Sequence, residues 1–414
     1  MKKYFLLACA FCAFGVADAA TIQFSSPDKK LQVTVADDGG RPTYRVVCGE
    51  TVFLEQSPLG LLTNIGDFSQ GMTLQESSFS SSPVSGHYEL PTIKRSKVDV
   101  RATKAVCPFY KDGKHIFDVV FHVSDHDVAF KYKMYPQGNT LCCVVKEETT
   151  GFVLPQGTTT FLCPQAGPMG GFARTSPSYE TSYTADGEMG KNGWGNGYTF
   201  PCLFRTGNKG WVLISETGVD SRYCASRLMG KDGGLYTIGF PQEGEYNGNG
   251  TACPGIALPG ETPWRTVTVG QTLAPIVETT IPYDVVEPLY EPSRRYVYGR
   301  GTWSWILWQD NSINYDDQVR YVDMASAMGY EYTLIDNWWD NNIGHKRMED
   351  LIKYAQGKGV DIFLWYSSSG YWNDIEQGPI NIMCDPITRK KEMRWMQQQG
   401  VKGIKVDFFG GEPL

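Results

Sequence analysis

The sequence of 414 residues has little positive charge and few histidines. It contains 38 Lys and Arg against 45 Asp and Glu, and no basic cluster is strong enough to indicate nucleic-acid binding. The five histidines lack a metal-binding spacing such as H-E-x-x-H, and no G-x-S-x-G segment indicates a serine hydrolase. After the N-terminus, no apolar run is long enough to cross a bilayer. We therefore expect neither a nucleic-acid partner nor a membrane span, whereas the oligomeric state stays open.

The first residues have the three parts of a secretory signal peptide. Lys2 and Lys3 precede an apolar stretch from Phe5 to Val16, and Ala17-Asp18-Ala19 matches an A-x-A cleavage site. We predict a signal peptide over residues 1–19, cleaved after its last alanine. A short membrane anchor is the alternative, which the length of the apolar stretch disfavours.

Cysteines beyond this segment show no metal or redox pattern. Nine remain, an odd number, and no two of them are spaced C-x-x-C. At least one thiol is therefore free, and for most of the nine we favour a buried free cysteine acting as a small hydrophobic residue. His122 lies close to Asp125, His126 and Asp127, and we interpret this group as a solvated strand end.

Residues 20–283 have the pattern of an antiparallel β domain. Short stretches of alternating or β-branched residues recur between turn clusters, and no amphipathic helix is evident. The clearest stretches are Leu31–Val35, Lys97–Arg101, Ile116–His122, Val128–Met134, Gly210–Ile214 and Arg265–Val269. A domain of this size, roughly 260 residues, indicates a large N-terminal β-sandwich.

Strands and helices alternate after a proline-rich linker at residues 284–295. We expect four strands, at 296–305, 330–336, 360–366 and 401–408, separated by three helices. Asn314 and Asp385-Pro386 predict two of the helix starts, and Gly329 predicts a helix end. Polar and aromatic residues at the strand ends favour a (β/α)8 TIM barrel over a doubly wound sheet. A whole barrel takes about 250 residues, so residues 296–414 correspond to its first half.

The fourth expected strand carries the sharpest chemical pattern. Lys405 and Asp407 are two residues apart, so both side chains face the same side of a strand, which in a barrel is the interior. The ammonium favours an ionised carboxylate, and an ionised carboxylate can act as a nucleophile at an anomeric carbon. A buried ion pair that only stabilises the barrel is the structural alternative.

The second expected strand ends in the same way, at Asp336. A carboxylate that accepts from sugar hydroxyls, beside an indole that stacks on the sugar ring, is typical of carbohydrate sites. We therefore name Trp303, Trp305 and Trp339 as candidate sugar contacts. For any single tryptophan, packing in the core is the commoner role.

Taken in order, these features resemble glycoside hydrolase family 97. The residues that carry the resemblance are Tyr179-Glu180 in the β domain, Trp303-Ser304-Trp305, Gly329 to Asp336, and Gly403 to Gly411. The resemblance implies a retaining, exo-acting α-glycosidase of α-galactosidase type, with Asp407 as nucleophile, and an oligosaccharide as substrate. It implies that Lys405 and Asp336 contact substrate hydroxyls, and that Glu180 is a ligand of an active-site calcium ion.

The resemblance also implies that the acid/base glutamate and the remaining calcium ligands lie beyond residue 414. We therefore expect this chain to be truncated and inactive alone, and to be exported to the periplasm of a Gram-negative bacterium. Two alternatives stay open. One is an α-glucosidase or another pyranosidase of the same family, and the other is an inactive fragment that acts at most as a carbohydrate-binding β-sandwich.

Overall fold

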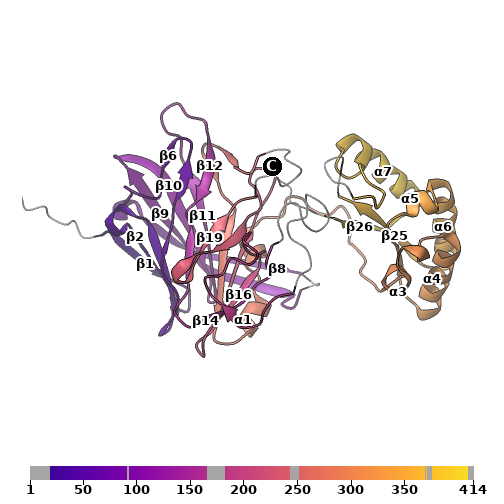
Figure 1. Cartoon of the computed structure of the whole chain (residues 1–414), viewed down its shortest axis with the longest axis horizontal. Helices are drawn as coiled ribbons and strands as arrows, with labels where there is room; N and C mark the ends of the chain where they lie inside the picture. Colours follow the sequence, from indigo (N-terminus) through magenta and orange to yellow (C-terminus); the bar gives the residue numbers. More distant parts are fainter. Residues whose placement is uncertain are drawn as a thin grey trace, which may run out of the picture.

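The structure is a computed structural model and describes residues 19–90, 93–165, 182–242, 251–368, 370 and 375–408. Figure 1 shows a β body followed along the chain by a smaller α/β body. The segment between the last helix of the β body and the first strand of the α/β body is largely exposed. Within the described residues, no helix is both long and apolar enough to cross a membrane.

The β body is built from four sheets, and the described strands in them pair antiparallel. The eleven-stranded sheet contains β15 (Gly187–Glu188), β14 (Thr158–Phe161), β16 (Cys202–Thr206), β17 (Gly210–Thr217), β22 (Trp264–Gly270), β11 (Asp127–Met134), β10 (Lys114–Val123), β9 (Lys97–Lys111) and β7 (Thr73–Leu74), with β21 (Gly260–Glu261) on β11 and β8 (Ser80–Glu89) on β9. The smaller sheets are β1 (Thr21–Ser25), β2 (Leu31–Ala36), β3 (Thr43–Cys48) and β4 (Thr51–Pro58); β20 (Gly255–Ala257), β12 (Cys142–Glu148), β5 (Leu61–Thr63) and β6 (Gly66–Asp67); and β13 (Gly151–Val153), β19 (Leu235–Gly239) and β18 (Arg227–Gly230).

One hydrophobic core lies between these sheets and explains the alternation in the sequence. Leu31, Val33 and Val35 of β2 are buried while the residues between them are partly exposed, so one face of the strand packs inward. All six stretches predicted as strands are strands, which confirms the β-sandwich. No amphipathic helix was evident in this part of the sequence, and the structure adds two short helices at its C-terminal end, α1 (Ala274–Glu278) and α2 (Ile281–Val285). Five residues are too few to show a helical period.

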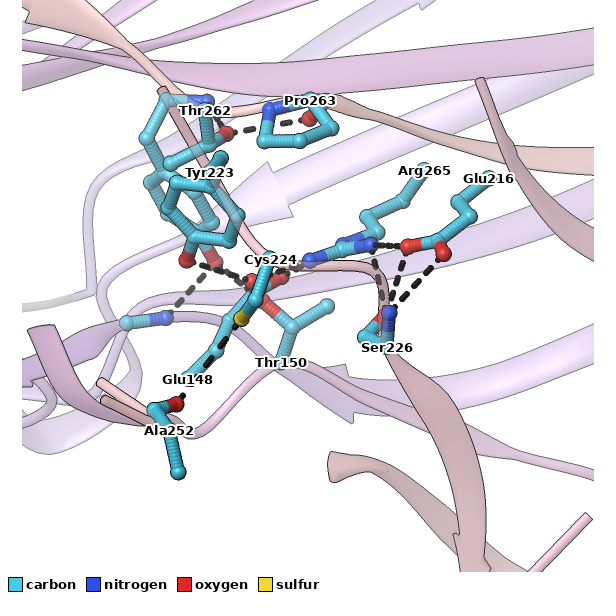
Figure 2. Close-up of polar contacts among 12 residues, drawn as sticks. Glu148, Thr150, Glu216, Tyr223, Cys224, Ser226, Ala252, Thr262, Pro263 and Arg265 are labelled. Atoms are coloured by element: carbon cyan, nitrogen blue, oxygen red, sulfur yellow. Dashed lines mark hydrogen bonds and ion pairs between the residues drawn. The ribbon is translucent and has the colours of Figure 1, made fainter. Parts of the chain in front are cut away.

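A buried cluster of charged and polar side chains joins the strands of this body (Figure 2). Arg265 on β22 donates through Nε and Nη2 to the two carboxylate oxygens of Glu148, at 2.9 and 2.6 Å. Its Nη1 contacts Glu216 and donates to Ser226 Oγ at 2.9 Å. The Tyr223 hydroxyl also donates to Glu148, at 3.3 Å. The cluster therefore connects the ends of β12, β17 and β22 with the loop that follows β17.

The α/β body is a parallel sheet of four strands in the order β23-β24-β25-β26, as expected for half a barrel. Its elements are β23 (Gly301–Trp303), α3 (Trp305–Trp308), α4 (Tyr315–Met328), β24 (Tyr332–Ile335), α5 (Trp339–Asn342), α6 (His345–Gly357), β25 (Asp361–Ser367), α7 (Pro386–Gln399) and β26 (Gly403–Asp407). Helices α4, α6 and α7 contribute to one hydrophobic core together with the strands.

The predicted helix ends are found in the structure. The Asn314 side chain accepts from the backbone N–H of Asp317 at 3.0 Å, and Asp385 accepts from Thr388 at 2.6 Å. Gly329 ends α4 with a left-handed backbone, at φ 64°. The first strand is shorter than predicted, because the chain turns into α3 after a strand of three residues, and Trp305 lies in that helix.

All nine described cysteines are free thiols. Cys107, Cys143, Cys202 and Cys224 are buried, and burial raises the pKa of each thiol. For these four the interpretation as small hydrophobic residues is confirmed, but it is wrong for most of the nine, because the other five are half-buried or exposed.

Candidate functional site

The candidate site lies at the C-terminal ends of the parallel strands. Lys405 and Asp407 are on β26, and Asp336 directly follows β24. In β24, Thr333 and Ile335 are buried toward the helices, so the alternation turns Asp336 to the other face of the sheet. In β25, Ile362, Leu364 and Tyr366 belong to the helix-side core in the same way. The side chains between them, together with Lys405 and Asp407, face the side that forms the interior of a barrel.

A single ammonium joins the two carboxylates of this site. Lys405 Nζ lies 3.1 Å from Asp336 Oδ2 and 3.2 Å from Asp407 Oδ2. Asp336 is buried, whereas Lys405 and Asp407 are about one-third exposed. The three predicted residues are therefore brought together, and the nucleophile candidate is the more accessible of the two carboxylates.

Each carboxylate also accepts a hydrogen bond from the backbone N–H of the next residue. Asn337 donates to Asp336 Oδ1 and Phe408 donates to Asp407 Oδ1, both at 2.8 Å. Phe408 has a left-handed backbone, with φ 59°, which is unfavourable for a bulky residue. Strained conformations of this kind concentrate at functional sites.

The Asp407 carboxyl is held in its ionised form. Burial raises its pKa, but the Phe408 N–H, the Trp365 indole and Lys405 outweigh this effect, so the pKa lies below its ordinary value. The carboxylate is consequently charged at neutral pH. A charged, partly accessible carboxylate at a strand end can attack an electrophilic carbon.

Trp303 and Trp305 lie beside this cluster. Trp303 donates from Nε1 to Asp336 Oδ2 at 2.5 Å, and Lys405 Nζ lies 4.5 Å from the centre of its ring. The two indoles are stacked, with centroids 5.8 Å apart. Trp305 Nε1 donates to Asp310, which also accepts from Asn337. Both rings are half-buried and can offer an apolar surface next to the carboxylates.

Trp339 does not lie at the cluster. Its ring is fully buried in the core, stacked on Trp395, and its Nε1 donates to the backbone carbonyl of Trp365 at 2.9 Å. The predicted sugar contact is therefore corrected to a packing role, because Trp339 begins the short helix α5 and faces the helices.

The predicted calcium ligand Glu180 lies outside the described residues. In the described ranges, no three His, Cys, Asp or Glu side chains are close enough together to hold a metal ion. The acidic residues of the candidate site are held by Lys405 and by N–H groups instead. They do not by themselves form a calcium site.

Sequence reasoning passed over one residue of this site. Trp365 is not among the tryptophans named above as candidate sugar contacts, yet its Nε1 donates to Asp407 Oδ2 at 3.2 Å. Trp365 lies opposite Lys405 in the β25–β26 register. This pairing places the indole within reach of the aspartate two residues further along β26, and it depends on the strand register, which the sequence does not give.

Both bodies match models of one protein family. Residues 24–288 match the model Glycosyl-hydrolase 97 N-terminal, and residues 296–413 match the model Glycoside hydrolase 97. Together the two matches cover most of the chain, and they meet at the segment between the two bodies.

Two curated relatives are similar along nearly the whole chain. A probable retaining alpha-galactosidase of Streptomyces bingchenggensis is 28% identical, over 94% of this chain and 56% of that protein. A retaining alpha-galactosidase of Bacteroides thetaiotaomicron is 24% identical, over 99% of this chain and 63% of that protein. The chain thus spans little more than half the length of these relatives.

Solved structures give the same fold. A beta-arabinopyranosidase superposes with a TM-score of 0.91 at 58% identity, over 95% of this chain and 63% of that one. A Glycoside Hydrolase Family 97 enzyme from Pseudoalteromonas sp. strain K8, solved in complex with panose, superposes with a TM-score of 0.74 at 18% identity, over 94% of this chain and 59% of that one.

Proposed function

Because the chain belongs to glycoside hydrolase family 97, we propose that the protein carrying it is a retaining, exo-acting glycoside hydrolase with Asp407 as nucleophile. One observation carries the proposal. Asp407 is kept ionised at the end of a barrel strand, with its carboxylate joined to Lys405 and still about one-third exposed.

In the proposed reaction, Asp407 attacks the anomeric carbon of a terminal sugar. A bond from the carboxylate oxygen to that carbon forms while the bond to the leaving oxygen breaks, and an acidic carboxyl protonates the leaving oxygen. The same group, now a carboxylate, takes a proton from a water molecule whose oxygen bonds to the anomeric carbon while the bond to Asp407 breaks, which releases the sugar. We expect this acid/base residue in the part of the protein beyond residue 414.

The neighbours of Asp407 would bind the sugar. Asp336 and Lys405 offer an acceptor and a donor for ring hydroxyls, and Trp303 and Trp305 offer an apolar surface for the ring face. Lys405 also keeps the nucleophile charged before attack.

We propose terminal α-D-galactopyranosides as substrates, as the names of the two curated relatives suggest. β-L-Arabinopyranosides are a second candidate, favoured by the 58% identity to a beta-arabinopyranosidase. The two sugars have the same ring configuration, and the pentose only lacks the hydroxymethyl group at C5. One nucleophile can therefore serve both, and space around C5 decides between them.

The test is a set of nitrophenyl glycosides given to the whole protein that carries this sequence. We expect hydrolysis of the α-D-galactopyranoside, the β-L-arabinopyranoside or both, and much slower hydrolysis of the α-D-glucopyranoside. NMR should show that the first product retains the configuration of the substrate. A first product of inverted configuration would rule out Asp407 as a covalent nucleophile.

We also propose calcium binding through Glu180, which rests on the resemblance to the family, and export through residues 1–19, which rests on the signal-peptide pattern of those residues. Metal analysis of the purified protein, with Glu180→Gln for comparison, tests the first. Mass spectrometry of the exported protein tests the second, with Ala20 expected as the first residue. No step of the proposed reaction depends on the metal.

A further inference from the structure

A cavity of about 440 Å³ lies on the outer face of the eleven-stranded sheet. Its floor includes Val120 and His122 of β10, which alternate with the core residues Phe117, Val119 and Phe121 and therefore point away from the core. Residues of β9 and β11 extend the floor on both sides, and Trp264 and α2 contribute to the wall. The volume falls in the range of about 300–1,000 Å³ that is typical of small-molecule sites.

His122 is the unusual residue of this cavity. It is only 6% exposed, and neither ring nitrogen has a hydrogen-bond partner among the described residues. The expectation that His122 belongs to a solvated strand end is therefore wrong. Burial lowers its pKa, although Asp127 acts in the opposite direction, so the ring is neutral at pH 7. A neutral imidazole has one N–H donor and one acceptor nitrogen, and leaving both unpaired is costly.

The charged side chains around the cavity balance one another. Lys104, Lys131 and Lys133 face Asp118, Glu261 and Asp284. The carboxylates already have partners within the protein, since Lys131 binds Glu261 at 2.5 Å and the Tyr88 hydroxyl donates to Asp284 at 2.5 Å. Asp118 likewise contacts the His115 ring and accepts from the Tyr135 hydroxyl. A lining without excess charge does not select an ion.

The remaining groups suit a neutral ligand with several hydroxyls. Lys104 and Lys133 offer donors, and His122 offers a donor and an acceptor. The Trp264 indole lines the same cavity, with Lys131 Nζ 4.5 Å from its ring centre. An aromatic ring combined with a few polar groups of both kinds is how proteins bind sugars.

We propose that this cavity binds a monosaccharide unit through His122 and Trp264, as a carbohydrate site separate from the Asp407 cluster. The site lies in the β body and needs no residue of the α/β body. It does not depend on the proposed catalytic function, and an inactive protein would keep it.

The imidazole signals of the five histidines in this sequence provide a direct test by NMR of the whole protein. Five single substitutions assign the signals. We expect D-galactose, D-glucose or L-arabinose to shift the His122 signal saturably in the millimolar range, and to leave the His87 signal unchanged. His87 lies on β8 with an exposed side chain paired to Asp99, so it reports on non-specific effects.

The variants His122→Leu and Trp264→Leu should each weaken this binding about tenfold or more, measured by saturation-transfer NMR on the sugar. His87→Leu is the matched control and should bind like the unchanged protein. If none of the three sugars moves the His122 signal, the proposal is overturned, even where the protein hydrolyses glycosides. A shift produced by inorganic phosphate alone would equally overturn it, because the cavity would then be an anion site.

Discussion

The two bodies of this chain each contain a cluster of one cation and two carboxylates, and the clusters differ in how they are closed. In the β body, Arg265 lies between Glu148 and Glu216, and the three side chains are 1%, 0% and 11% exposed. In the α/β body, Lys405 lies between Asp336 and Asp407, and the corresponding values are 30%, 3% and 36%. The same set of charges is therefore buried in one body and partly exposed to solvent in the other. Below, the Arg265 set is called the buried cluster and the Lys405 set the open cluster.

The donor geometry matches this difference. The Arg265 guanidinium has a fixed fork that satisfies Glu148 with two hydrogen bonds and leaves another N–H group for Glu216. The Lys405 ammonium contacts each carboxylate through one oxygen. Asp407 thus keeps an accessible carboxylate for a substrate, whereas Glu148 has no exposed surface. We infer that the Arg265 cluster stabilises the fold and that the Lys405 cluster is accessible to a substrate.

The largest expected effect comes from Asp407→Asn in the whole protein. Removing the nucleophile should lower kcat by on the order of 10⁴-fold or more. Stability should change little, because a partly exposed ion pair such as Lys405–Asp407 contributes at most about 1 kcal/mol. Kinetics on the preferred nitrophenyl glycoside and thermal unfolding measure the two effects. Full activity in this variant would show that the open cluster is not catalytic.

Arg265→Gln should have effects opposite to those of Asp407→Asn, with a large loss of stability rather than a direct loss of kcat. Removing one partner of a buried charge cluster leaves Glu148 and Glu216 uncompensated and should cost roughly 3–5 kcal/mol of unfolding free energy. Arg222→Gln is the matched control, since Arg222 binds Asp220 at the surface, where a pair contributes about 0–1 kcal/mol. Denaturant unfolding of the three proteins measures the difference. Equal losses from Arg265 and Arg222 would mean that burial does not distinguish the clusters.

Local patterns in the sequence were enough to place the three residues of the open cluster at the ends of strands, whereas their shared role came from the resemblance to the family. Lys405 and Asp407 are neighbours on one strand, and the end of β24 follows from a helix stop at Gly329 and a short β-branched run. The caps at Asn314 and Asp385 were equally local, since each side chain reaches a backbone N–H only three residues away.

The buried cluster could not be predicted in this way. Arg265 and Glu148 are separated by 117 residues, and they meet only because β12 and β22 lie in different sheets that pack together. The role of Trp339 and the burial of His122 were misjudged for a similar reason. In both cases the face of the element that is covered depends on tertiary packing, which the neighbouring residues do not reveal.

Lys405→Met removes the positive charge of the open cluster and tests whether that charge keeps Asp407 reactive. Lys405 helps to lower the pKa of Asp407, so its loss raises that pKa. Because the ionised carboxylate is the reactive form, the acid limb of the kcat/KM profile should move to higher pH. We expect kcat/KM to fall roughly ten- to hundredfold. Lys402→Met is the control from the same segment, as Lys402 has an exposed side chain, and it should leave the profile unchanged.

Trp365→Phe should give the smallest effect, again a rise in the pKa of Asp407 and a fall in kcat/KM. The substitution removes the indole N–H that donates to Asp407 Oδ2 at 3.2 Å but leaves Lys405 in place. The pKa of Asp407 should rise less than in Lys405→Met, and kcat/KM should fall roughly three- to tenfold. Trp395→Phe is the matched control, because it removes an indole N–H bonded to Glu349 on the helix side. An acid limb that moves equally in both variants would mean that Trp365 acts through packing alone.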